Sequence, residues 1–177
     1  MTWKPGDRPA AAASMIRVDQ AGEFGATRIY EGQLAIMGQR SAMARKISAM
    51  ALQEEKHRAF FDRMIAERGV RPTLLQPFWD LAGFALGAVT AAIGPEAAMA
   101  CTAAVETEID KHYEEQLVAL GDSDPELSDA IREFQAEELE HRDTALASGA
   151  EDAPAYPLLS AAIRLGCRVA IATAKRI

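Results

Sequence analysis

The sequence predicts an all-α protein, in which a four-helix bundle carries two additional apolar helices. Good helix formers, among them Ala, Leu, Met, Glu and Arg, are abundant along the 177 residues. No alternating apolar and polar run bounded by hairpin turn residues occurs, so strands are not expected. Gly and Pro divide the chain into six helical segments. The length suits a single domain, residues 1–177, with a full bundle core.

The first three helices follow a loose arm at residues 1–10. The expected helix ranges along the whole chain are about 12–37, 41–68, 76–93, 95–120, 124–148 and 158–175. Gly38 ends the first helix, because glycine accepts the left-handed conformation common after a helix. Ser41 is a favourable N-cap for the second helix, which ends before Gly69. Pro72 then interrupts helicity before the third.

Prolines also mark the starts of the last three helices. Pro95 suits the first turn of the fourth helix, where its missing N–H is not needed. Ser123 or Asp124 caps the fifth helix. We expect Pro154 and Pro157 to precede the sixth helix. Nothing in the sequence indicates an interdomain linker or a low-complexity segment.

One ligand pattern occurs twice in the sequence: a lone Glu, a gap, then Glu-x-x-His. The residues are Glu23, Glu54 and His57 in the first half, and Glu106, Glu138 and His141 in the second. Glu and His three apart share a helix face. The midpoints between the two Glu of each half fall in predicted turns, near Gly38 and at Asp122. If each half is a helical hairpin, all six side chains meet at one level, as in a carboxylate-bridged di-iron centre.

Other interpretations of these residues exist. Glu and His often sit together on a solvated helix face, although two of only three histidines fall in the repeated motif. Carboxylates with imidazoles suit iron or manganese, while zinc usually takes fewer ligands. Spacing alone leaves other acids open as ligands, namely Glu31, Glu55, Glu108 and Glu140. The twofold match selects the six.

Several polar residues are placed to support such a site. Each ligating imidazole has a second nitrogen that needs an acceptor. Acceptors one turn from a ligand, or directly before a Glu-x-x-His motif, are Asp19, Asp110, Gln53 and Glu137. The alternative is that these four are ordinary surface residues.

The third histidine, His112, and its neighbour Tyr113 fall on different faces of the fourth helix. His112 is six residues after Glu106, about 240° around a helix, so we expect it not to point at the metals. Tyr113 is seven residues after Glu106 and shares its face. Tyr113 is therefore a candidate for a hydrogen bond at the site, a redox-active group, a substrate contact or a core tyrosine.

Charge and composition exclude some functions. The net charge of −7 argues against a nucleic-acid partner, which would require a basic patch. Cys101 and Cys167 lie in apolar helical context outside any Cys-x-x-Cys motif, which is typical of reduced thiols in a cytoplasmic protein. The N-terminal residues have no apolar core of a secretion signal.

The third and sixth helices are unusually apolar. Residues 81–94 contain no charge, but this stretch is shorter than the roughly 20 residues that span a bilayer. A buried crossover helix is one interpretation. The other is a surface for membrane or for a long apolar substrate, with candidate residues Phe78, Trp79, Phe84 and Leu86. The sixth helix interleaves apolar with basic residues, which suits an anionic lipid surface or a closing helix of the bundle.

The chain contains the runs IRVDQAGEFGATRIYEGQ, VRPT, GFALGAVTAAIGPEAAMACTAAVE, EELEHRD and GCRVAI. On these runs, the sequence resembles the demethoxyubiquinone hydroxylase family of ubiquinone biosynthesis over about residues 14–177. The resemblance implies a ferritin-like di-iron monooxygenase that hydroxylates C6 of the demethoxyubiquinol ring with O2 and two electrons. It places the ligands on the same six residues that spacing selects. Glu54 is preferred to its neighbour Glu55 because only Glu54 is three residues before His57.

The resemblance also implies partners and a location. The expected substrate is a polyprenyl quinol, the cofactor is a pair of iron ions, and the reductant is NADH or the quinol itself. We expect peripheral binding to the cytoplasmic face of a bacterial inner membrane, with a lipid-binding accessory protein or a homo-oligomer as further partners. Competing interpretations are a ferritin-like ferroxidase, a manganese catalase and a non-enzymatic lipid-binding scaffold.

Overall fold

The computed structural model describes residues 10–38 and 40–176, and every regular element in this part of the chain is helical. The all-α prediction is therefore confirmed. The expected arm lies outside the described residues, except for Ala10, which begins the first helix. The elements are α1 (Ala10–Met37), α2 (Ala42–Arg68), α3 (Gln76–Ile93), α4 (Pro95–Leu120), α5 (Pro125–Ala147), the 3-10 helix η1 (Ala150–Asp152) and α6 (Tyr156–Ala174).

Local signals set most helix ends. The Ser41 side chain accepts a hydrogen bond from the Ala44 amide and caps α2. Gly69 ends α2 at φ 63°, in the left-handed region where a Cβ is disfavoured. At the start of α5, the Asp124 side chain accepts from the Leu127 amide. These three predicted boundaries are confirmed.

The region before α6 differs from the prediction. The helix begins at Tyr156, so Pro157 lies within its first turn instead of before it. Proline is tolerated there because first-turn amides have no helical partner. Residues 150–152 form a 3-10 turn that carries no distinctive sequence signal, and Ala155 takes a left-handed conformation at φ 53°.

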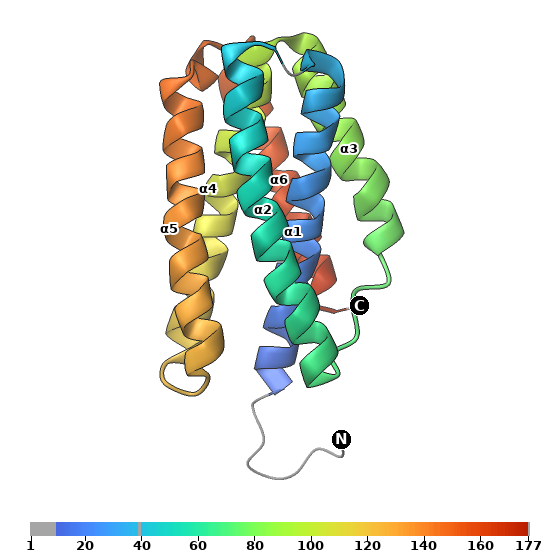
Figure 1. The fold of residues 1–177 in the computed structure, drawn as a ribbon, viewed down its shortest axis with the longest axis vertical. Coiled ribbons are helices and arrows are strands. Elements are labelled where there is room, and N and C mark those ends of the chain that lie inside the picture. Colours follow the sequence, from blue (N-terminus) through green and yellow to red (C-terminus); the bar gives the residue numbers. More distant parts are fainter. Residues whose placement is uncertain (1–9, 39, 177) are drawn as a thin grey trace.

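Two antiparallel hairpins, α1–α2 and α4–α5, form the bundle, and their turns lie at opposite ends of the molecule (Figure 1). α3 runs back along α1 and so connects the end of the first hairpin to the start of the second. α6 packs on α4. The opposed turns relate the hairpins by an approximate twofold axis, and this symmetry brings the two halves of the repeated motif to the same level.

α3 contacts α1 at backbone distance. A Cβ built at Gly87 of α3 would lie 1.9 Å from the Ile29 carbonyl oxygen, and one at Gly32 of α1 would lie 2.2 Å from the Phe84 carbonyl oxygen. Glycine at these positions lets the two helices approach closely. The outer side of α3 stays exposed, as Leu81 and Val89 show with 72% and 59% of their surface accessible.

Candidate metal centre

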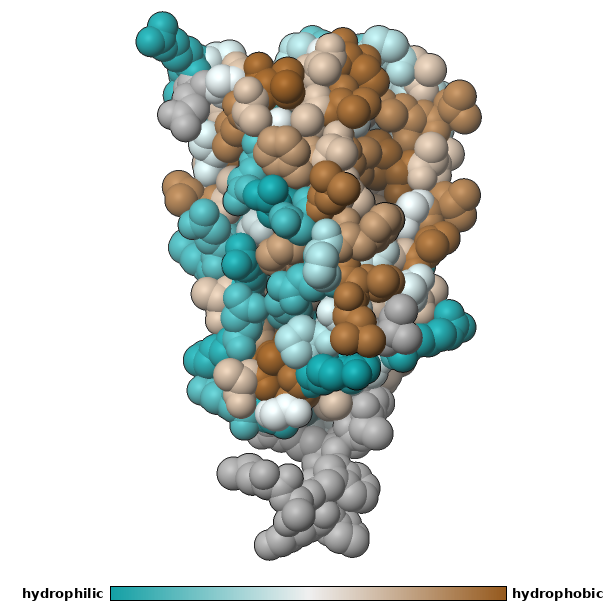
Figure 2. All heavy atoms as spheres, turned by 90° about the vertical axis from the view of Figure 1, so that its right-hand side faces the viewer, coloured by the Kyte–Doolittle hydropathy of each residue, from teal (hydrophilic) through white to brown (hydrophobic). Residues whose placement is uncertain are grey.

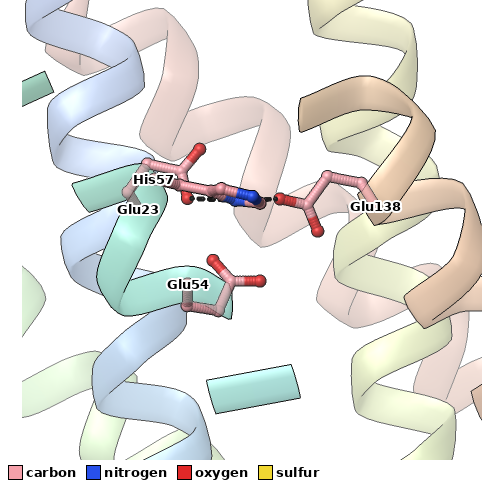
Figure 3. A group of neighbouring side chains, drawn as sticks. All are labelled: Glu23, Glu54, His57 and Glu138. Carbon is pink, nitrogen blue, oxygen red and sulfur yellow. Dashed lines mark hydrogen bonds and ion pairs between the residues drawn. The ribbon is translucent and has the colours of Figure 1, made fainter. Parts of the chain in front are cut away.

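The structure brings the six predicted ligands together at the centre of the bundle. Glu23 comes from α1, Glu54 and His57 from α2, Glu106 from α4, and Glu138 and His141 from α5, and all six are buried. Figure 3 shows four of them pointing toward one another. Their burial excludes the interpretation of solvated charge pairs on a helix surface. Apolar clusters pack toward both ends of the bundle, around Ile47 and Met99 on one side and around Phe61 and Ile131 on the other.

The six residues form two overlapping groups of potential ligand atoms. One group holds Glu23 and His57, the other holds Glu106 and His141, and Glu54 and Glu138 belong to both. Within each group, the ligand atoms lie within 4.8 Å of one another. This arrangement has room for two adjacent metal ions that would share the Glu of each Glu-x-x-His motif.

Both imidazoles direct Nδ1 toward the cluster and Nε2 away from it. His57 Nδ1 lies 3.1 Å from Glu138, and His141 Nδ1 lies 3.0 Å from the same carboxylate. His57 Nε2 lies 2.5 Å from Glu137, and His141 Nε2 lies 2.9 Å from the Gln53 side-chain oxygen. Each outer acceptor thus belongs to the opposite hairpin and holds the ring in orientation.

The remaining polar candidates lie elsewhere. Asp19 accepts a hydrogen bond from Gln116 and lies beside His112. Asp110 accepts from Gln135. Of the alternative acids, Glu31, Glu55 and Glu140 are exposed, and Glu108 is paired with Arg164 and Lys111.

Two tyrosines cross-link the lone carboxylates. Tyr113 of α4 donates a hydrogen bond to Glu23 of α1, while Tyr30 of α1 donates to Glu106 of α4 at 3.0 Å. Both rings are buried. Sequence reasoning missed Tyr30, although it follows Glu23 by the same seven residues that separate Tyr113 from Glu106. The repeated spacing was the available signal.

Burial and mutual repulsion control the protonation of the carboxyls. Burial raises the pKa of Glu54 and of Glu106 well above the ordinary range, and the charge of Glu138 adds to the effect. Burial also opposes ionisation of Glu138, but hydrogen bonds from His141 and His57 outweigh it and lower its pKa. Burial likewise opposes protonation of His57, yet Glu138 and Glu23 raise its pKa to about 11.

The residues fit a pair of divalent metal ions. Among the described residues, both oxygens of Glu54 and one oxygen each of Glu23 and Glu106 are buried without a hydrogen-bond partner. Buried charges in proteins are normally paired or coordinate metals. Two divalent cations would balance the four carboxylates, and the mixed oxygen and nitrogen donor set suits iron or manganese.

The metal-free protein is expected to lose stability as the pH rises from about 7 to 10. A raised folded-state pKa means that stabilisation is lost above the unfolded value, which is 6.5 for His57 and 4.5 for Glu54 and Glu106. Glu138 acts in the opposite sense, but only below pH 4.5. Urea unfolding at pH 7, 8.5 and 10 measures the trend. Stability that rises over this range would contradict the assignment.

Bound metal should reverse this dependence. Metal ligands must be deprotonated, so affinity increases with pH and protons are released on binding. The matched comparison is the same titration with Mn(II) present. A pH-independent affinity would show that the ion binds outside the six-residue cluster.

An apolar groove of about 480 Å³ lies close to the cluster, although none of the six clustered residues lines it. α1, α3, α4 and α6 all line it, and it passes Gly22, next to Glu23, and Val105, next to Glu106. Of the predicted surface residues, Trp79 and Leu86 line this groove. Phe78 is exposed, while Phe84 lies under the Arg28 guanidinium, 5.1 Å from the ring centre.

The fold and this site define a ferritin-like helical bundle whose buried Glu/His cluster is suited to two metal ions. Residues 10–174 match the model of the family described as "Ubiquinone biosynthesis protein COQ7". The chain belongs to this family, and the resemblance found in the sequence is confirmed.

Curated relatives match almost the whole chain. A "3-demethoxyubiquinol 3-hydroxylase" of Rhodospirillum rubrum is 53% identical over 175 residues, which cover 98% of this chain and 82% of the relative. An "NADPH-dependent 3-demethoxyubiquinone 3-hydroxylase, mitochondrial" of Mus musculus is 49% identical, covering 94% and 78%. A "5-demethoxyubiquinone hydroxylase, mitochondrial" of Saccharomyces cerevisiae is 41% identical, covering 92% and 77%.

Proposed function

We propose that this enzyme uses O2 and two electrons to hydroxylate the demethoxyubiquinol ring at the carbon that lacks the methoxy group. This carbon, C6 in the numbering used above, is numbered 3 in the names of two of the relatives described. The observation that carries the proposal is the apolar groove lined by Gly22 and Val105, the direct neighbours of Glu23 and Glu106 in the buried Glu/His cluster. A ferroxidase or an iron store requires the cluster but has no use for a groove suited to a lipid.

The six clustered residues would hold two iron ions, with Glu54 and Glu138 shared between them. When bound, the di-iron group supplies the electron transfer to O2 that ring hydroxylation requires. Tyr30 and Tyr113 hold the lone carboxylates in place through their hydroxyl groups. Gln53 and Glu137 fix the imidazole rings. The apolar clusters at both ends of the bundle exclude bulk water from the reacting oxygen.

The groove supplies the binding site for the substrate. Its walls are almost entirely aliphatic, and small residues such as Gly25 and Gly166 leave it open, with no atom within 4 Å of a Cβ built at either position. The quinol ring would lie near Val105, next to Glu106, with the polyprenyl tail running out between α3 and α6. Moving the whole tail into water would cost roughly 0.8 kcal/mol per CH2, so the enzyme must meet the membrane.

α3 and α6 are the proposed membrane-facing elements. Figure 2 shows hydrophobic side chains gathered on the side of the molecule that carries α3. Exposed apolar residues on these two helices include Phe78, Leu81, Val89, Ile93, Leu158, Leu165 and Val169, and Leu74 is exposed just before α3. Among the described helices, only α6 is long and apolar enough to cross a membrane by length and composition. We propose that both helices instead lie along the surface, because α6 also carries Arg164 and Arg168.

The cellular setting follows from the same proposal. We place the enzyme peripherally on the cytoplasmic face of a bacterial inner membrane, where its quinol substrate resides. The mouse relative is named as NADPH-dependent, and we propose a nicotinamide nucleotide as the source of electrons here as well. We also propose that the enzyme binds a further protein partner, either a lipid-binding accessory protein or a second copy of the chain.

The double variant Leu81→Ser/Val89→Ser should bind liposomes at least about tenfold more weakly. Each exposed side chain contributes about 1 kcal/mol of binding free energy when it is buried in the membrane, and losing both contributions produces an effect of this size. Co-sedimentation with vesicles containing anionic lipid measures it. Leu52→Ser is the matched control, because the exposure of Leu52, 62%, lies between those of Val89 and Leu81 but Leu52 is on α2. Equal binding by the double variant and the wild type would refute the assigned face.

A single turnover under ¹⁸O2 tests the proposed activity. The protein is loaded with Fe(II) and supplied with a short-tail demethoxyubiquinol and a chemical reductant, and mass spectrometry reads the quinone. We expect one labelled oxygen on the ring. Oxidised iron and consumed O2 without a labelled product would instead identify a ferroxidase.

A further inference from the structure

A buried polar group beside the metal cluster consists of Asp19, His112 and Gln116. The proposed reaction has so far given these three residues no role. The Gln116 amide donates to Asp19 at 2.7 Å and lies 2.9 Å from His112 Nε2. His112 Nε2 lies 3.4 Å from the Asp19 carboxylate. All three side chains are buried. Burying an ionisable pair is costly, so its presence requires an explanation.

The approximate twofold symmetry of the site does not extend to this group. Asp19 is four residues before Glu23, and the corresponding residue before Glu106 is Thr102. His112 is six residues after Glu106, where the first half has Ile29. The ligands and the two tyrosines are duplicated in both halves, but the Asp–His pair is not. The pair is therefore not needed merely to build two metal positions.

His112 connects this group to solvent. It lines a surface pocket of about 420 Å³ between α4 and α6. The other charged groups that line the pocket are Glu108, Lys111, Glu115, Arg168, Lys175 and Arg176. On the opposite side, the imidazole faces Asp19 of α1. Water in the pocket can therefore exchange protons with the imidazole.

Asp19 lies on α1 one helical turn before the ligand Glu23, and Tyr113, which donates to Glu23, directly follows His112. Among the described residues, one Asp19 oxygen and one Glu23 oxygen are buried without hydrogen-bond partners. Burial raises the pKa of Asp19, and the hydrogen bond and charge of His112 act in the opposite direction.

We infer that His112 and Asp19 relay protons from the surface pocket to the Glu23 side of the metal cluster. The inference rests on the proposed function. In that reaction, one oxygen atom of O2 enters the ring C–H bond and becomes a hydroxyl group. The other takes two electrons from the nicotinamide reductant and two protons, and leaves as water. The relay supplies these protons while the apolar groove stays dry.

The test compares Asp19→Asn and His112→Gln with Thr102→Val, the matched change at the symmetry-related position. The first readout needs no turnover. Mn(II) is mixed with the metal-free protein, metal binding is followed by electron paramagnetic resonance, and released protons are followed with a pH dye. We expect the two signals to coincide in the wild type and in Thr102→Val. In both relay variants, proton release should lag metal binding at least fivefold.

The second readout is turnover with iron in H2O and D2O. We expect product formation to fall at least tenfold in both relay variants with a larger solvent isotope effect, and added imidazole to restore His112→Gln. Coincident signals and an unchanged isotope effect in His112→Gln would overturn the relay, even if Asp19→Asn failed to fold. If the wild type itself yields no labelled quinone but the proton lag persists, the proposed function fails and the relay stands as a route for proton release.

Discussion

Glu54→Gln should lower turnover by roughly a thousandfold or more while leaving the protein folded. Glu54 is shared by both potential metal groups, so its loss weakens two metal positions at once. A metal ion contributes several kcal/mol of charge stabilisation, and each 1.4 kcal/mol corresponds to about a tenfold change in rate. Iron content and single-turnover product yield measure the effect.

The same variant should be at least as stable as the wild type in the metal-free form. Both Glu54 oxygens are buried without hydrogen-bond partners among the described residues, and burial beside Glu138 raises the pKa of this carboxyl. The amide of glutamine resembles the neutral carboxyl and removes the repulsion that develops at high pH. Stability and function thus oppose each other at this residue.

Glu55→Gln is the matched control for this prediction. Glu55 directly follows Glu54 in the sequence, but its side chain is exposed on α2. We expect normal iron content and normal turnover in this variant. Loss of turnover in Glu55→Gln together with full activity in Glu54→Gln would exchange the two assignments.

The ligand cluster was predictable because its signal is local and repeated. The Glu-x-x-His spacing places two side chains on one helix face. The lone Glu lies at the same level on the facing helix only if the turn falls midway between the two Glu residues of that half. Ser41 and Asp124 carry the capping chemistry that marks such turns. Each of these inferences needs only neighbours along one hairpin.

The groove and the outer surface were not predictable in the same way. Periodicity gives the apolar faces of α3, but the neighbour of each face depends on how closely two helices approach. Gly83 and Gly87 let α3 contact α1, which turns Trp79 and Leu86 inward and leaves Leu81 exposed. Such close packing depends on pairs of residues far apart in the chain, and a single sequence does not show them.

Gly87→Ala should destabilise the fold by about 3 kcal/mol, and so lower the melting temperature by roughly 6 to 12 °C. The new Cβ would lie 1.9 Å from the Ile29 carbonyl oxygen and 2.8 Å from its carbon. Both are backbone atoms, so no side-chain rotation relieves the overlap and the helices must separate. The usual gain of about 1 kcal/mol for replacing helical glycine by alanine does not offset this cost. Thermal unfolding by circular dichroism measures the change.

Gly166→Ala is the matched control, because Gly166 is also helical but no atom lies within 4 Å of its built Cβ. We expect this variant to be as stable as the wild type or up to about 1 kcal/mol more stable. The larger Gly166→Leu should occupy the groove and raise the KM for quinol without removing iron. If Gly87→Ala had the same melting temperature as the wild type, the close contact at Gly87 would not be what holds α3 against α1. The position of α3 as a wall of the groove would then have to depend on other contacts.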